Sequence, residues 1–177
     1  MTDFVAFPKI ARLSRNIVVT EKIDGTNGCI YIGENSTFKV GSRTKWITPE
    51  DDNFGFAAWA YTHRDELMEL GPGTHFGEWW GYKIQRNYGL EEKRFSLFNV
   101  SRWRDVRPAC YHVVPILYEG IFDTAEVLRC LSSLEHNGSL AAPGFMKPEG
   151  VIVYHIAGNL YFKKTVHKDE APKGMQN

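Results

Sequence analysis

The chain has little cysteine and no long apolar run. Three cysteines occur in 177 residues, Cys29, Cys110 and Cys130, and no two have the spacing of a metal-binding pair. Scattered thiols of this kind suit a reducing, intracellular compartment. No apolar run reaches the roughly 18 residues of a membrane span, and the first residues do not form a secretory signal. We therefore expect a cytoplasmic protein without membrane contact, and a viral or phage source is compatible with this expectation.

The chain also lacks an excess of charge of either sign. Lys and Arg total 21, and Asp and Glu also total 21. A protein that coats nucleic acid without selectivity normally carries a basic surplus, so that class is disfavoured. The bases are unevenly placed, however, with seven against three acids between Lys83 and Arg107. This segment is either an ordinary solvated face or a surface that binds phosphates, and it is our candidate RNA face.

The hydrophobic pattern predicts one α+β domain. Hydrophobic residues make up 43% of the chain, enough for a substantial core. One helix is expected from a cap at Asn53 to Leu70, and a second from the N-cap Asp123, with Glu126 in a capping-box position, to just before Gly138. Strands are expected at residues 16–23, 28–33, 36–40, 75–82, 94–101, 114–122, 150–156 and 160–166. Strands around isolated helices favour mainly antiparallel pairing.

The segment from Glu21 to Gly28, E-K-I-D-G-T-N-G, carries the clearest chemical signal. Lys22 ends a hydrophobic strand, Asp24 follows two residues later, and Gly25 permits a tight turn. A lysine amine is a nucleophile only when deprotonated, which requires desolvation or a nearby positive group such as a metal. A hairpin with a surface lysine is the simpler interpretation of such a tetrad taken alone.

This segment resembles motif I of the covalent nucleotidyltransferases, which comprise ATP-dependent DNA ligases, RNA ligases and mRNA capping enzymes. In that family the lysine that matches Lys22 attacks the α-phosphate of a nucleoside triphosphate and forms a lysyl–NMP adduct. The residues after it are similar to the RNA ligase branch, because DNA ligases usually carry Arg where Asn27 stands. The RNA ligase 2-like group is the most similar, although it often has His at the position of Asp24.

Further segments match the family's motifs in order. Arg43 lies in a stretch that resembles motif Ia, where the matching arginine engages phosphate or the acceptor strand. Glu78 matches the motif III glutamate that binds ribose hydroxyls. Phe98 matches the aromatic residue of motif IIIa that stacks on the purine, for which an ordinary core position is the alternative. Glu149 matches the motif IV glutamate that serves the divalent metal, and carboxylate oxygens are the ligands that Mg²⁺ prefers.

The motif V region departs from the family pattern. The family commonly shows K-x-K, whereas Lys163 and Lys164 are adjacent here and must point to opposite faces of a strand. Alternation favours Lys163 as the phosphate ligand and leaves Lys164 as the alternative. The resemblance therefore implies one metal residue, Glu149, the catalytic Lys22 and a nucleotide-binding set of Glu21, Lys22, Asp24, Asn27, Arg43, Glu78, Phe98, Lys163 and Lys164.

The resemblance implies a nucleotidyltransferase (ATP-grasp-like) ligase core of two antiparallel β-sheets with flanking helices, spanning residues 1–177 as a single domain. It implies ATP and Mg²⁺ or Mn²⁺ as cofactors, and RNA ends in a nicked duplex or single strand as substrate. The C-terminal domain that follows this core in the family is not expected here, so a partner protein could supply it. The alternatives are a DNA ligase or capping-type enzyme, and a non-catalytic RNA- or nucleotide-binding module.

Overall fold

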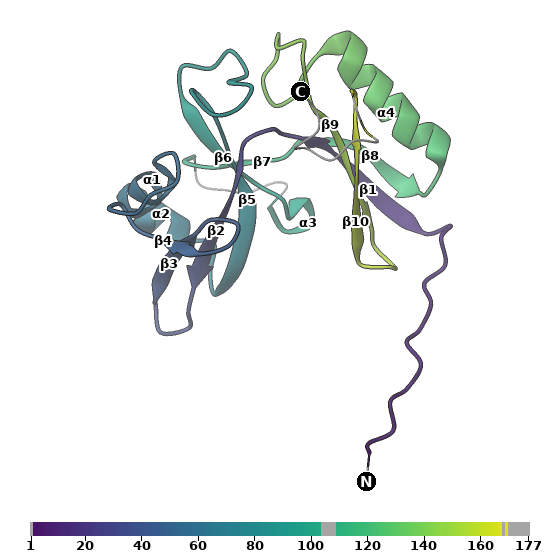
Figure 1. Cartoon of the computed structure of the whole chain (residues 1–177), viewed down its shortest axis with the longest axis horizontal. Coiled ribbons are helices and arrows are strands. Elements are labelled where there is room, and N and C mark those ends of the chain that lie inside the picture. The colour runs from purple at the N-terminus through teal and green to yellow at the C-terminus, as the bar shows by residue number, and fades with distance from the viewer. Residues whose placement is uncertain (1, 104–108, 168, 170–177) are drawn as a thin grey trace.

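A computed structural model describes residues 2–103, 109–167 and 169. Its strands form two sheets (Figure 1). The four-stranded sheet has the order β10-β9-β1-β8, and the six-stranded sheet has the order β4-β3-β2-β5-β6-β7. The strands are β1 (Asn16–Lys22), β2 (Thr26–Ile32), β3 (Phe38–Gly41), β4 (Trp46–Ile47), β5 (Gly73–Gly81), β6 (Lys93–Leu97), β7 (His112–Val113), β8 (Ile116–Ile121), β9 (Gly150–His155) and β10 (Leu160–Thr165).

The prediction of an α+β fold with two sheets is confirmed, with one correction to the pairing. The four-stranded sheet is antiparallel throughout, but β6 and β7 of the six-stranded sheet pair in parallel. The parallel pair joins Ser96 to His112 and Leu97 to Val113. A two-residue strand has no pattern that the sequence could reveal, so neither β7 nor β4 was expected.

The first helical region is two short helices instead of one. Helix α1 (Phe56–Thr62) and helix α2 (Arg64–Met68) meet at His63, whose φ of −100° and ψ of 20° depart from helical values. The expected cap at Asn53 is wrong, because Gly55 takes the N-cap position. The carboxylate of Asp52 instead accepts hydrogen bonds from the backbone N–H groups of Ala57 and Ala58, at 2.7 and 2.9 Å. A side chain outside the helix thus satisfies its first donors.

Helix α4 (Thr124–Asn137) confirms its predicted ends. The Asp123 side chain accepts a hydrogen bond from the Ala125 N–H at 2.8 Å, and Gly138 is the C-cap with a φ of 83°. The carboxylate of Glu126, expected in a capping box, instead accepts a hydrogen bond from the Arg129 guanidinium. The helix packs Val127, Cys130 and Leu134 against β1 and β9. This packing fixes one face of the sheet whose β1 strand ends at Lys22.

The segment predicted as a strand over residues 94–101 ends early. Strand β6 stops at Leu97, and helix α3 (Val100–Trp103) follows. Val100 belongs to a hydrophobic cluster that joins the two sheets, with Val18 and Ile23 from the β1 side and Trp80 from β5. Helices α1 and α2 cover the other side of the six-stranded sheet through Phe56, Ala57, Ala60 and Leu67. No described helix is long and apolar enough to cross a membrane.

Candidate active site

Lys22 lies at the end of β1, beside the point where the chain crosses to the other sheet. Its ammonium is 2.5 Å from the Glu149 carboxylate, and only 17% of the lysine side chain is exposed. Glu149 immediately precedes β9, and Lys22 pairs with Gly150 in the β1–β9 register. Gly25 then turns the chain so tightly that an added Cβ would lie 2.3 Å from the Trp79 carbonyl oxygen. The glycine is therefore required by close backbone approach.

Glu78 of β5 approaches the same region from the six-stranded sheet. One carboxylate oxygen accepts a hydrogen bond from the Gly25 N–H at 2.9 Å, and the other accepts from the Asn27 side chain at 3.0 Å. Burial raises the pKa of Glu78 to about 7. The Gly25 hydrogen bond and the charge of Lys22 oppose this rise, while the carboxylate of Glu149 adds to it. Glu78 thus links the turn after Lys22 to the second sheet.

Asp24 is buried and held by the loop after β5. Its carboxylate accepts from the Arg86 guanidinium at 2.9 Å, and its backbone N–H donates to the Tyr88 hydroxyl at 2.7 Å. Arg86 also donates to the Lys147 carbonyl oxygen at 3.0 Å. The Arg86 side chain therefore ties the turn after Lys22 to the segment that leads to Glu149. Arg86 was expected only as one of the bases between Lys83 and Arg107, because a base in a loop after a strand does not by itself indicate a site residue.

The strand register separates the two motif V lysines. Lys163 pairs with Ile152, which pairs with Thr20, so Lys163 shares a sheet face with Thr20 and Lys22. Lys164 pairs with Val151, which packs against α4 on the opposite face. The Lys164 ammonium donates to Asp169 at 2.9 Å. This register places Lys163 on the same face as Lys22.

The Glu21 side chain lies on the face opposite to Lys22. One of its oxygens accepts from the Ser139 hydroxyl at 2.5 Å, and the other accepts from the backbone N–H groups of Leu140 and Ala141 at 2.8 and 2.9 Å. Burial raises the pKa of Glu21, and these hydrogen bonds oppose the rise. The carboxylate thus anchors the loop after α4. Any nucleotide contact by Glu21 would come from its main chain.

Two further candidates lie on the six-stranded sheet. Arg43 follows β3 and is exposed. Phe98 follows β6, and its N–H donates to the Phe76 carbonyl oxygen at 3.0 Å. Phe98 is 37% exposed, and Phe76 is 60% exposed. The solvent-accessible ring of Phe98 is available to stack on a planar group, which a fully buried core phenylalanine would not be.

The bases of the candidate RNA face mostly have structural partners. Lys93 donates to the Phe54 carbonyl, Arg94 contacts Glu92 and the Ala141 carbonyl, and Arg102 donates to the Leu70 carbonyl. Arg86 holds Asp24, as described above. The expected positions of Arg104 and Arg107 lie outside the described residues. The described part of this segment therefore acts largely within the fold.

A divalent cation beside Lys22 would find few protein carboxylates to bind it. No group of three or more His, Cys, Asp and Glu side chains in the described ranges is placed to hold a metal ion by itself. Mg²⁺ in phosphoryl-transfer sites is usually bound by one or two carboxylates together with substrate phosphates and water. Glu149, which is 7% exposed and directed at Lys22, supplies one such carboxylate. The residues fit a metal that is shared with a bound phosphate.

Solved structures of an RNA ligase have the same fold. A variant of the Naegleria gruberi RNA ligase with ATP and Mn matches with a TM-score of 0.64 and 21% identity, over 88% of this chain and 51% of that chain. A second variant with AMP and Mn matches with a TM-score of 0.63 and 20% identity, over 86% and 50%. The chain therefore spans about half the length of these structures. No curated protein sequence matches it.

The chain therefore shares the fold of these ligase structures. A family model described as RNA ligase matches residues 15–168, which is most of the sequence. The chain belongs to the RNA ligase family.

Proposed function

We propose that the chain carries out the nucleotidyl-transfer chemistry of an ATP-dependent RNA ligase, with Lys22 as the nucleophile. The observation that carries this proposal is the placement of Lys22 at a strand end, 2.5 Å from Glu149, in a member of the RNA ligase family. Glu78 holds the turn after Lys22 through the Gly25 N–H, and Asp24 lies within that turn, where it binds Arg86. Family membership favours this function over a DNA ligase, a capping-type enzyme or a non-catalytic binding module.

The first transfer forms a covalent enzyme–AMP bond. The Lys22 amine must be neutral to attack, and its low exposure together with a divalent cation held by Glu149 would favour loss of its proton. The amine then attacks the α-phosphorus of ATP, a P–N bond forms, and the bond to the β-phosphate oxygen breaks to release pyrophosphate. Phe98 would stack on the adenine, and Glu78 would accept hydrogen bonds from ribose hydroxyls. Asn27 would act through Glu78, to which its side-chain amide donates.

The next two transfers join the RNA ends. A 5′-phosphate oxygen of RNA attacks the AMP phosphorus, the P–N bond breaks, and the lysine amine is regenerated. A 3′-hydroxyl then attacks the activated 5′-phosphate, loses its proton, and displaces AMP. Arg43 and the pocket-facing lysine, Lys163, are proposed to hold phosphate oxygens during these steps.

A divalent ion is part of the proposal. The related Naegleria gruberi structures with ATP or AMP also contain Mn, which supports ATP together with Mg²⁺ or Mn²⁺ as cofactors. A cation held by Glu149 and phosphate oxygens would neutralise charge that develops on the transferred phosphate. The chain's own residues would bind the nucleotide, align Lys22 and limit water access.

Strand sealing tests this function. Nicked RNA duplexes carrying a plain 5′-phosphate or a pre-adenylated end would be incubated with the chain and with Lys22→Ala. We expect the variant to seal only the pre-adenylated nick, because Lys22 is needed only until AMP has reached the RNA. We propose that a partner protein or a further domain improves the grip on RNA, so sealing of the plain 5′-phosphate nick by the chain alone should be weak. Efficient plain-nick sealing by Lys22→Ala would overturn the assignment.

Nucleotide choice separates the ligase from the capping alternative. Covalent labelling with ATP should exceed labelling with GTP when both are supplied with Mg²⁺. Equal or stronger labelling with GTP would favour a capping-type enzyme, and no labelling with either nucleotide would favour a non-catalytic module.

A further inference from the structure

A stacked pair of tyrosines lies on the face of the four-stranded sheet that carries Lys22. Tyr154 of β9 pairs with Tyr161 of β10, and Tyr154 pairs with Val18 of β1, so all three share the face of Lys22. The two ring centroids are 4.5 Å apart with an angle of 24° between the planes. Tyr161 is nevertheless 65% exposed. One face of its ring is covered by Tyr154, and the other is open to solvent.

These tyrosines continue a row that begins beside Lys22. Thr165 pairs with Gly150, which pairs with Lys22, so Thr165 marks the level of the reactive amine on β10. Lys163 and Tyr161 follow on the same face at intervals of about 7 Å, twice the rise per strand residue. Along β10, Thr165 at the level of Lys22 is therefore followed first by the cation Lys163 and then by the exposed aromatic ring of Tyr161. Tyr154 connects this row of residues to the β9–β10 turn, because its hydroxyl donates a hydrogen bond to the Asn159 side-chain oxygen at 2.9 Å.

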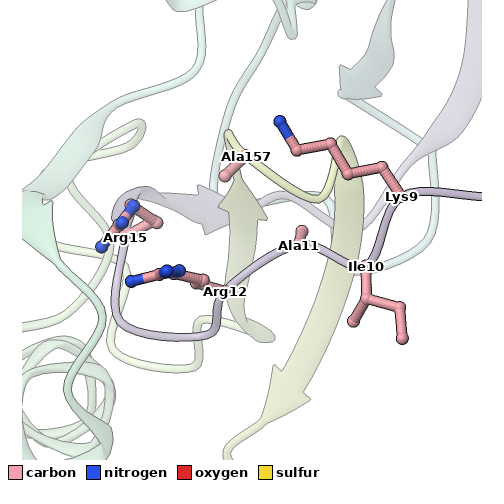
Figure 2. A pocket seen from close by; sticks show the side chains of 6 residues that line it. All are labelled: Lys9, Ile10, Ala11, Arg12, Arg15 and Ala157. Atoms are coloured by element: carbon pink, nitrogen blue, oxygen red, sulfur yellow. The ribbon is translucent and has the colours of Figure 1, made fainter.

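Three basic side chains stand at the tip of this hairpin. Lys9, Arg12 and Arg15 line a hollow together with Ala157 of the β9–β10 turn (Figure 2). Their segment is anchored next to the turn, because the Leu13 carbonyl oxygen contacts the His155 ring at 2.8 Å. Figure 2 shows Arg12 and Arg15 directed to the same side of the segment. Arg15 and Ala157 lie seven residues from Lys22 and Gly150, so the hollow presents positive charge about 23 Å from the level of Lys22. Its anchor His155 pairs with Ile17 on the face opposite to Lys22, so a strand that reaches the hollow from the tyrosines passes around the tip of the hairpin.

We propose that this row holds the single-stranded part of the RNA substrate and leads its end to Lys22. We call the row the strand track, and it consists of Lys163, Tyr161, Tyr154, Arg12, Arg15 and Lys9. Lys163, the exposed ring of Tyr161 and the bases at the hairpin tip match single-stranded nucleic acid, because phosphates bind cations while a base stacks on an aromatic ring without sequence preference. Across the sheet, Tyr161 pairs with Tyr154, Tyr154 with Val18, and Val18 with Glu119 of β8. Glu119 is the one acidic residue among these four paired residues. The proposal rests on the proposed function, since it assigns the substrate path of the same site.

RNA binding by variants of Tyr161 tests the strand track. A fluorescently labelled single-stranded RNA with a 5′-phosphate would be titrated with the chain and followed by anisotropy. Tyr161→Ala and Tyr161→Leu should each weaken binding roughly five- to hundredfold, the range expected for one lost base–aromatic stack. Tyr161→Phe should restore it. The Leu variant keeps apolar bulk at the strand edge, so it separates the loss of a flat ring from a loss of packing.

The matched control lies one residue along the same strand. Phe162 is 56% exposed, which is comparable to Tyr161. It lies on the sheet face opposite to Lys22, because adjacent strand residues point to opposite faces. Phe162→Ala should leave RNA binding unchanged. RNA affinity of Tyr161→Ala equal to that of Phe162→Ala would overturn the proposal, and so would an unaltered chain that does not bind single-stranded RNA.

Salt dependence tests the basic hollow. Arg12→Ala should reduce the slope of log affinity against log salt by about 0.7 if one phosphate contact is lost from a single strand. Arg129→Ala, on α4, is the charge control and should keep the slope of the unaltered chain. An unchanged slope in Arg12→Ala would remove the hollow from the track. Covalent labelling of the unaltered chain by ATP is a separate readout, so failure of the track and failure of the proposed function are distinguishable.

Discussion

The buried carboxyl of Glu78 makes the stability of the fold depend on pH. Its ordinary pKa of 4.5 rises to about 7 because the side chain is only 8% exposed. Between these two values the folded chain holds a proton that the unfolded chain has released. The free energy of unfolding contributed by this group therefore falls as the pH rises from about 4.5 to 7, and the loss is complete above pH 7.

The size of the effect follows from the shift. A shift of one pKa unit corresponds to about 1.4 kcal/mol, so the rise of Glu78 corresponds to about 3 kcal/mol as an upper limit. Glu78→Gln removes the titration while it keeps an oxygen that can accept from the Gly25 N–H. The variant should therefore gain stability relative to the unaltered chain by up to that amount between pH 5 and pH 8.

Urea denaturation of both proteins across this pH range provides the assay. Comparison at each pH cancels titrations that the two chains share, including that of Glu21, whose pKa is also raised by burial. Glu91→Gln, at an exposed position, is the matched control for loss of a carboxylate. A difference between the unaltered chain and Glu78→Gln that stays constant with pH would refute the reasoning, as would a relative gain of the unaltered chain with rising pH.

Three further predictions use other parts of the site. Phe98→Ala should weaken ATP binding by roughly 1–3 kcal/mol through loss of base stacking, and unchanged affinity by calorimetry would make Phe98 a spectator. Lys163→Ala should slow lysine adenylylation by roughly a hundredfold or more, while Lys164→Ala should act as a solvated surface change; two equal large losses in rapid-quench assays would contradict the register argument. Glu21→Ala should lower the free energy of unfolding by roughly 3 kcal/mol or more, because it leaves the Ser139 hydroxyl and two loop N–H groups without their acceptor. A loss below about 1 kcal/mol in urea denaturation would show that water replaces the carboxylate as their acceptor.

Local sequence signals predicted the elements that local interactions define. Helix α4 begins and ends where Asp123 and Gly138 indicate, because a cap side chain and a positive-φ glycine act within a few residues. The capping by Asp52 is also local, but Asn53, the next residue, gives the same capping signal, so the sequence does not say which of the two acts. The break at His63 accompanies the packing of α1 and α2 on the sheet. No periodicity carries that information. The parallel pairing of β7 was missed for the same reason.

In the site, too, local sequence signals predicted some residues, while contacts between distant parts of the chain were missed. Motif order identified Lys22 and Glu149, which the structure brings to 2.5 Å although they are far apart in the sequence. Alternation favoured Lys163, and the strand register is in line with that preference. Motif matching could not reveal that the Glu21 carboxylate faces the loop after α4, or that Arg86 holds Asp24. Both contacts join residues from distant parts of the chain, so they emerge only when the sheets are assembled.

The central claim is that Lys22 is adenylylated, and intact-mass spectrometry tests it most directly. After incubation with ATP and Mg²⁺ or Mn²⁺, the account predicts the added mass of one AMP, removed by acid as expected of a phosphoramidate and located on Lys22 by peptide mapping. Lys22→Ala should carry none. An AMP adduct on Lys22→Ala, or an adduct of the unaltered chain that maps to another residue, would contradict the account.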